Sequence, residues 1–197
     1  MNRNNKWNVR LLTWIILGVL TCQNSSWAED VSVRLVNEGR SVYRVEGGFQ
    51  VVAPPSTIWE VLTDYNRIDE FVPFMKRSYV KERREGKLLL EQEALAKFFL
   101  FTRTIRILQE VQEDPQKRIL FRDVSHRDFE FYEGSWRVEP SKEYVWVQYE
   151  VRAKPIFSVP SFVARAMFKR TAQELLQAVR LEILRRRVNN RQEWMKN

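Results

Sequence analysis

Apolar and polar residues alternate with a period of two through most of the chain between Ser41 and Arg152. This alternation is typical of strands with one buried and one solvent-facing side. It predicts strands at 41–52, 78–84, 88–96, 101–111, 118–124, 129–139 and 144–152. Short, turn-like segments separate most of these strands, so we expect neighbours in the chain to pair antiparallel. Within the first strand, Gly47 and Gly48 interrupt the pattern and predict a bulge or sharp bend.

Two other regions have helical spacing. Residues 55–62 and 68–71, between the first two strands, predict two short helices, the first opened by Pro55. Residues 161–188 predict one long helix, since its apolar residues recur on one side. That side carries Ala164, Phe168, Ala172, Leu175, Leu176, Val179 and Ile183.

The first 28 residues have the pattern of an export signal. A polar start with three basic and no acidic residues precedes an apolar run over 11–20, and Ser26-Trp27-Ala28 supplies small residues for cleavage. We therefore expect an exported protein, in a bacterial periplasm. An uncleaved anchor is the alternative; a lipoprotein at Cys22 is disfavoured, because Thr21 is unusual before a lipidated cysteine.

Composition excludes several classes of site. The chain has one Cys and one His, so it can form neither an internal disulfide nor a Cys or paired-His metal site. We predict no metal and no cofactor. Cleavage after Ala28 removes three basic residues, which lowers the formal net charge from +8 to +5. The aromatic content of 13% is too high for a disordered chain and supplies a large core.

The sequence has few polar residues whose pattern indicates a catalytic role. His126 could act as an acid or base with Asp123 or Asp128, but its polar surroundings favour a solvated turn. Asp64 follows the first short helix and is expected to cap backbone N–H groups. No nucleophile elbow or phosphate-binding loop is present in the sequence. We predict no catalytic residue.

Three segments carry a family resemblance: Pro55 to Tyr65 followed by Phe71-Val72-Pro73, then Gly134-Ser135-Trp136-Arg137-Val138, and Pro155 to Pro160. They resemble the START/polyketide cyclase (SRPBCC) superfamily, in its cyclase/dehydrase or coenzyme-Q-binding Coq10-like branch. The resemblance implies an α+β helix-grip fold, in which a curved antiparallel sheet of about seven strands wraps around a long C-terminal helix. The two short helices follow the first strand.

The resemblance also implies a cavity between the sheet and the long helix. Large apolar residues that could line it include Trp59, Phe74, Phe98, Phe99, Phe121, Phe131, Trp146 and Phe162. The favoured ligand-binding candidates are Phe71, Phe101, Trp136, Phe157 and Met167, although many aromatic residues will fill the core instead. A hydrophobic small molecule, such as a lipid, isoprenoid or quinone, is the implied ligand. A cyclase or dehydratase using the same cavity is the alternative function.

The domain layout follows: signal peptide 1–28, N-terminal extension 29–40, ligand-binding domain 41–188 and basic tail 189–197. Arg185, Arg186 and Arg187 form a basic cluster that could contact an anionic membrane surface. The alternative is that these cations complement the carbonyl groups at the helix end. Export argues against a nucleic-acid partner.

Overall fold

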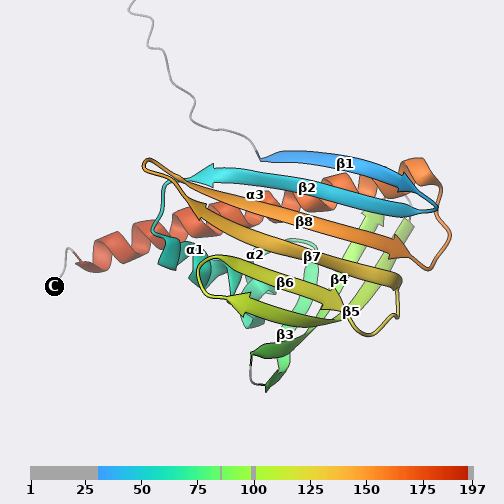
Figure 1. Cartoon of the computed structure of the whole chain (residues 1–197), viewed down its shortest axis with the longest axis horizontal. Coiled ribbons are helices and arrows are strands. Elements are labelled where there is room, and N and C mark those ends of the chain that lie inside the picture. The colour runs from blue at the N-terminus through green and yellow to red at the C-terminus, as the bar shows by residue number, and fades with distance from the viewer. Residues whose placement is uncertain (1–30, 85, 99–100, 195–197) are drawn as a thin grey trace, which may run out of the picture.

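The structure, a computed structural model, describes residues 31–84, 86–98 and 101–194, without the side chains of 98, 101 and 190–194. A curved sheet forms one layer and a long helix lies behind it (Figure 1). The elements in chain order are β1 (Ser32–Gly39), β2 (Val42–Val51), α1 (Pro55–Leu62), the 3₁₀ helix η1 (Tyr65–Arg67), α2 (Ile68–Phe71), β3 (Met75–Arg84), β4 (Lys87–Phe98), β5 (Phe101–Asp114), β6 (Arg118–Asp123), β7 (Phe129–Pro140), β8 (Val145–Pro155) and α3 (Ser161–Trp194).

The sheet has the strand order β1-β2-β8-β7-β6-β5-β4-β3, and every neighbouring pair is antiparallel. The predicted α+β helix-grip fold is confirmed, with eight strands instead of about seven. The unpredicted strand is β1, which lies in the segment 29–40. It sits at the edge of the sheet, where many of its side chains are exposed, so it lacks a clean apolar alternation.

Helix α3 packs against one side of the concave face, mainly on β2 and β1. The apolar side predicted for α3 is confirmed, because all seven of its residues are buried or partly buried against the core. Ala172, Leu176 and Ile183 of α3 belong to the same buried core as Val45 and Phe49 of β2. The other strands are therefore only partly covered by the helix.

Gly47 sets how closely the helix approaches the sheet. The pairing of β2 with β8 runs through Gly47 and Gly48 without a register shift, so the predicted bulge is wrong. A Cβ atom on Gly47 would lie 2.7 Å from Leu176 Cδ1 and 2.7 Å from the Ser32 carbonyl oxygen. The missing side chain makes room for the helix, and the sharp bend that the sequence offered as the alternative to a bulge stays a prediction.

A network of charged groups joins the C-terminal part of α3 to the segment after α1. Arg186 donates to Asp64 Oδ2 at 2.6 Å and to Glu182 Oε1 at 2.7 Å, and Arg185 also donates to Glu182. The side chains of Asp64, Glu182 and Arg186 are only 21%, 7% and 16% exposed. Asp64 makes no side-chain cap, so that prediction is wrong: its carboxylate pairs with a residue 122 positions away instead.

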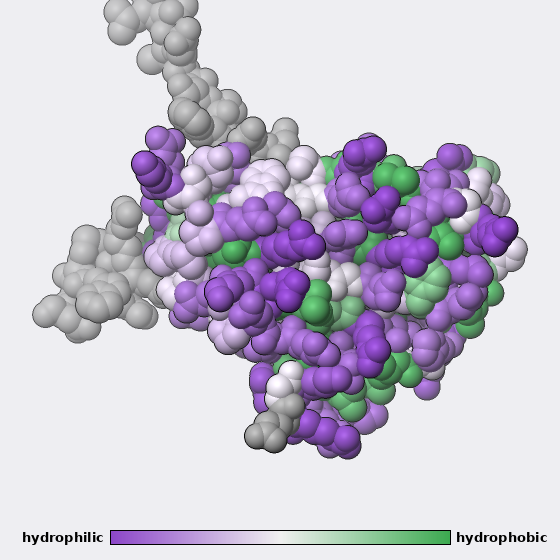
Figure 2. Space-filling view, in the orientation of Figure 1, coloured by the Kyte–Doolittle hydropathy of each residue, from purple (hydrophilic) through white to green (hydrophobic). Residues whose placement is uncertain are grey.

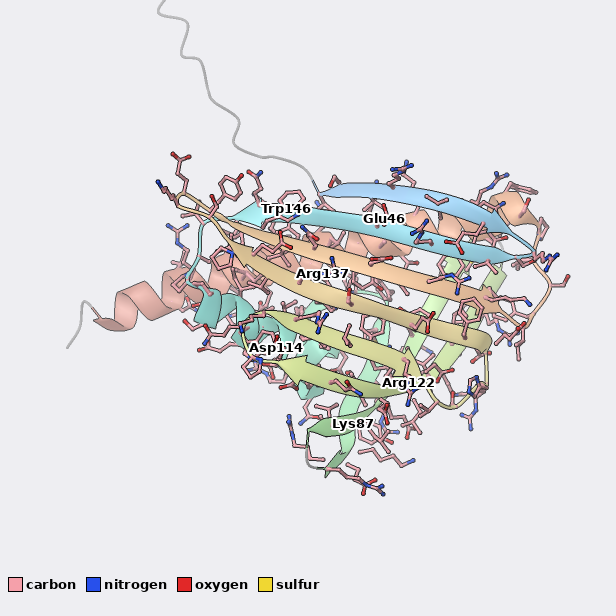
Figure 3. The ribbon with its side chains drawn as sticks, viewed as in Figure 1. Glu46, Lys87, Asp114, Arg122, Arg137 and Trp146 are labelled. Atoms are coloured by element: carbon pink, nitrogen blue, oxygen red, sulfur yellow. The ribbon has the colours of Figure 1, made fainter. Side chains whose placement is uncertain are left out.

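The convex face of the sheet is polar. Figure 2 shows a mostly hydrophilic surface over this face, with small apolar patches. Glu46, Arg122 and Arg137 stand on it, away from α3 (Figure 3). Arg122 and Lys87 both bind the Glu110 carboxylate, at 2.7 and 3.2 Å. Within the described residues, no helix is long and apolar enough to span a membrane.

Substitution of Gly47 by alanine should lower the free energy of unfolding by about 1–3 kcal/mol, because the new methyl group overpacks the contact with Leu176. Chemical unfolding of the two proteins measures this difference. Glu46→Ala is the matched control, since Glu46 precedes Gly47 but stands on the convex face, and it should change stability by less than about 0.5 kcal/mol. Equal stabilities for Gly47→Ala and Glu46→Ala would contradict the packing role of Gly47.

The pH dependence of stability should report on Glu182. Hydrogen bonds from Arg185, together with those from Arg186, lower the pKa of Glu182 from its ordinary value of 4.5. A lowered folded-state pKa stabilises the fold above the ordinary value, and this stabilisation is lost as the pH falls through the lowered pKa. Glu182→Gln should therefore cost about 1–3 kcal/mol at neutral pH and less under acidic conditions.

Glu174→Gln provides the comparison for Glu182→Gln. Glu174 lies on the same helix and pairs with Arg170 at 2.7 Å, but both side chains are well exposed. Its substitution should cost only about 0.5 kcal/mol. Urea unfolding at neutral and acidic pH tests both variants, and a pH-independent cost for Glu182→Gln would contradict the ionic contribution of Glu182.

Candidate functional site

A cavity of about 210 Å³ lies between α3 and the strands that the helix leaves partly uncovered. Its wall comes from α1, η1, α2, α3, the first residue of β3 and the concave face of β4 to β8. It extends from Val61 and Tyr65, near the end of α1, to Phe157 and Val159 in the connection between β8 and α3. The cavity exists because α3 covers β1 and β2 rather than the centre of the sheet.

Four of the five favoured candidates lie in the cavity wall. Phe71 ends α2, Trp136 is on β7, Phe157 follows β8 and Met167 is on α3. The fifth, Phe101, begins β5, and its side chain lies outside the described part of the structure. Contact of these residues with a ligand stays a prediction.

The wider set of apolar candidates divides between the wall and the surface. Phe74 and Phe121 line the cavity, whereas Trp59 packs against the core. Trp146 lies on the convex face (Figure 3), and Phe162 is 64% exposed. The side chains of Phe98 and Phe99 lie outside the described residues.

A bulge in β7 reverses the expected position of Phe131. Phe129 pairs with Pro155 and Phe131 with Lys154, so β7 contains one extra residue at this point. Simple alternation would place Phe129 and Phe131 on the same side, but the extra residue shifts the phase of the strand. Tyr132 therefore lines the cavity, while Phe131 lies against the Arg152 guanidinium, 4.7 Å from its ring centre. Assigning Phe131 to the cavity wall was wrong.

Aromatic side chains from neighbouring strands form one section of the wall. The ring of Phe121 packs between those of Tyr132 and Tyr149, with centroid distances of 5.9 and 6.2 Å. Gly134 pairs with Phe121 across the sheet, and a Cβ there would lie 2.6 Å from the Phe121 ring. Trp136 packs on Tyr149 with a centroid distance of 4.6 Å. Gly134 thus leaves the space that Phe121 occupies.

The polar side chains in the described part of the wall are uncharged. The hydroxyls of Tyr132 and Tyr149 lie 3.2 Å apart and hydrogen bond to each other. Gln92 donates to Ser78 Oγ at 3.1 Å. Burial raises the pKa of both Tyr132 and Tyr149, so these hydroxyls remain protonated under ordinary conditions.

Tyr65 differs from the other two tyrosines. It is 4% exposed, and its hydroxyl is buried beside the carboxylate of Glu113. Burial is the main cause of its raised pKa, and the carboxylate of Glu113 is the second. The Oε1 oxygen of Glu113 is buried as well.

Among the described residues, the cavity lining includes no Asp, Glu, His, Lys or Arg. His126, the acid–base candidate from the sequence, lies outside the wall in a turn with a positive φ of 51°. Asp123 accepts hydrogen bonds from the backbone N–H groups of Leu108, Ser125 and His126. This carboxylate organises the turn and does not orient the imidazole.

Arg103 and Asp128 form an ion pair beside Phe157, at the end of the cavity that is far from Tyr65. The Arg103 guanidinium lies over the Phe157 ring, 4.1 Å from its centre, and donates to Asp128 at 2.8 Å. Asp128 also accepts from the backbone N–H of Arg106. The charge of Arg103 is thereby paired, and its flat face supports a cavity-lining aromatic ring.

Sequence reasoning missed three tyrosines of the wall. Tyr149 shares the apolar side of its strand with Val147 and Val151, so the alternation alone could have placed it there. Tyr132 could not be assigned without knowledge of the bulge. Tyr65 ends the first segment that carries the family resemblance, and only the fold shows that it lines the cavity.

Solved structures with this fold include proteins of several kinds. The chain is 20% identical to a STAR-related lipid transfer protein from Xanthomonas axonopodis, with a TM-score of 0.67 over 79% of this chain and 94% of that one. It is 19% identical to the Zhui aromatase/cyclase from Streptomyces sp. R1128, with a TM-score of 0.64 over 74% and 95%. A Mycobacterium smegmatis START superfamily protein gives 14% identity and a TM-score of 0.62, over 72% and 97%. The TM-scores show a shared fold, and at these low identities the likeness shows the fold alone.

A search of curated protein sequences finds no match. A family model, in contrast, matches residues 51–180, which span α1 to most of α3 and include nearly all of the cavity wall. The chain belongs to the family described as polyketide cyclase/dehydrase and lipid transport.

Proposed function

We propose that this chain is an exported binding or transfer protein that holds a hydrophobic small molecule, such as a lipid, isoprenoid or quinone, in its cavity. The wall of the cavity supports this function, because its described part consists of apolar and uncharged polar side chains. An apolar ligand gains free energy by leaving water for such a surface. The pattern of residues 1–28 supports export, and Phe71, Trp136, Phe157 and Met167 are the proposed ligand contacts.

The chemistry of the wall favours binding over a cyclase or dehydratase reaction. General acid–base catalysis needs a group that exchanges protons near the working pH, within reach of the substrate. The titratable side chains in the described wall are tyrosines, and burial raises the pKa of all three. Such hydroxyls can orient a ligand but are poor proton acceptors.

Contact of Arg185, Arg186 and Arg187 with an anionic membrane surface stays a prediction. Arg185 and Arg186 both pair with Glu182, and Arg186 also pairs with Asp64. These ion pairs give two of the three arginines a role within the fold. We therefore base the proposed function on the cavity and not on this cluster.

Protein purified from its native host should carry an apolar molecule at near-stoichiometric amounts. Native mass spectrometry should show a bound mass, and organic extraction should release it for identification. The Ala164→Trp variant, purified in parallel, controls for adherent lipid. Protein that carries no apolar molecule, or the same molecules in both forms, would contradict the proposal.

Blocking the cavity should abolish binding without unfolding the protein. Ala164 lines the cavity from α3 and is 2% exposed, so Ala164→Trp should lower the affinity for an apolar fluorescent probe by about tenfold or more. Ala166→Trp is the matched control, because Ala166 lies two positions away on the exposed side of the same helix. Circular dichroism checks the fold, and equal probe affinities in the two variants would place the binding site elsewhere.

A further inference from the structure

We propose that the cavity contains a polar subsite for a carboxamide group, formed by the side chains of Gln92 and Gln109. The ligand is then an uncharged molecule with an apolar body and a carboxamide at one position. This inference rests on the proposed function and specifies the class of ligand that the cavity takes. It makes Gln109 a specificity-determining residue.

The first observation is the side-chain amide of Gln109. This residue lines the cavity from β5 and is only 6% exposed. Among the described residues its amide has no hydrogen-bond partner, yet neither its nitrogen nor its oxygen is fully enclosed by protein atoms, unlike the hydroxyl of Tyr65. Because the rest of the residue is buried, the accessible surface of the Gln109 amide faces the cavity.

Gln92 lies near Gln109 on the same wall. In the register of β4 and β5, Gln109 pairs with Leu90, two residues before Gln92. The two glutamines are therefore diagonal neighbours, within reach of one ligand group. Gln92 Nε2 donates to Ser78 Oγ at 3.1 Å, which holds the side chain in place. Its carbonyl oxygen Oε1 has no partner among the described residues and is not fully enclosed, so it is available to a ligand.

Gln109 interrupts an apolar side of β5. Ile107 and Val111, two positions before and after it, also line the cavity. An apolar side chain at position 109 would continue this side, whereas a buried amide without a partner loses its hydrogen bonds to water. Buried polar groups are nearly always hydrogen bonded for this reason. Gln109 therefore lowers the stability of the ligand-free protein, and a ligand that pairs with the amide offsets this loss.

The surroundings of the subsite favour a neutral ligand. Asp123 on β6 pairs in register with Gln109 and is 5% exposed. Among the described residues, its carboxylate accepts hydrogen bonds from backbone N–H groups and from the hydroxyl of Ser125, all of them uncharged donors. A carboxylate or phosphate group beside Gln109 would be repelled by Asp123, in addition to the cost of leaving water.

Hydrogen-bonding capacity selects a carboxamide among neutral groups. The subsite presents two carbonyl oxygens, those of Gln92 and Gln109, and the N–H donors of Gln109. A carboxamide supplies two N–H donors for the carbonyl oxygens and a carbonyl oxygen for the N–H donors. A hydroxyl group supplies a single donor, and a ketone or ester supplies none. The carboxamide therefore pairs most of the polar atoms that the subsite offers.

Four probes of equal chain length test the subsite: octanamide, octan-1-ol, octanoate and octane. Each competes with the neutral fluorescent probe N-phenyl-1-naphthylamine for the full-length protein, at about pH 8, where carboxylic acids are ionised. We expect octanamide to bind at least about tenfold more tightly than octanoate. Gln109→Met replaces the amide by an apolar chain of similar length. It should weaken octanamide binding by about three- to tenfold, weaken octan-1-ol binding less, and leave octane binding unchanged.

Stability in urea separates a ligand-binding role from a structural one. Gln109→Met should unfold at a higher urea concentration than the unmodified protein, because it removes a buried amide that has no protein partner. A residue that supported the core would give the opposite sign. Gln112→Met is the matched control, since Gln112 lies on the same strand but is exposed and outside the described wall. It should change neither the unfolding midpoint nor any affinity.

Gln92→Met repeats the test from β4. It should weaken octanamide binding by at least about twofold and leave octane binding unchanged, because the carbonyl oxygen of Gln92 is lost. Its stability should fall, since Ser78 loses its partner, so this variant is scored on affinity alone.

The outcomes separate the two proposals. A lower urea midpoint for Gln109→Met, or equal losses of octanamide and octane affinity in the two variants, would overturn the subsite while apolar binding stands. Octan-1-ol losing as much affinity as octanamide in Gln109→Met would overturn the assignment of a carboxamide. Failure of every probe to bind, including N-phenyl-1-naphthylamine, would overturn the proposed function and this inference with it.

Discussion

Helix α3 packs off-centre on the sheet, and this packing determines which part of the concave face is filled and which part is left open. The helix lies on β1 and β2, where Gly47 lets Leu176 come close to the backbone. A helix held at that edge cannot also fill the concave side of β4 to β7, so space remains there. The cavity therefore results from the position of α3 on the sheet.

Charged side chains lie outside the described cavity wall. On the convex face, the cations of Lys87 and Arg122 are exposed to water, and both pair with the less exposed carboxylate of Glu110. The cavity wall, in contrast, has only neutral polar groups among its described residues. Between these two environments, Asp64, Glu182 and Arg186 form a partly buried network in which each charge has a partner. The fold thus keeps its many charges out of the space available to a ligand.

Features governed by local periodicity could be predicted from the sequence, and features set by distant contacts could not. The alternation in β8 and the apolar side of α3 placed Val147 and Leu176 correctly in the core, because each pattern matches the geometry of its element. The partner of Asp64 is 122 residues away, so a local interpretation assigned it a helix cap instead. The role of Gly47 also depends on a distant residue, since the helix that contacts it is formed by the end of the chain.

The bulge in β7 has a consequence for the comparison of relatives. Before the bulge, the odd-numbered residue Phe129 faces the cavity, and after the bulge the even-numbered residue Tyr132 does so. The bulge thus exchanges the inward-facing and outward-facing positions of the strand. Among proteins that share the fold at 11–20% identity, an alignment that places its gap elsewhere would exchange inner and outer residues over part of β7. Ligand contacts in this family are therefore better transferred by superposing strand pairs than by matching sequence positions.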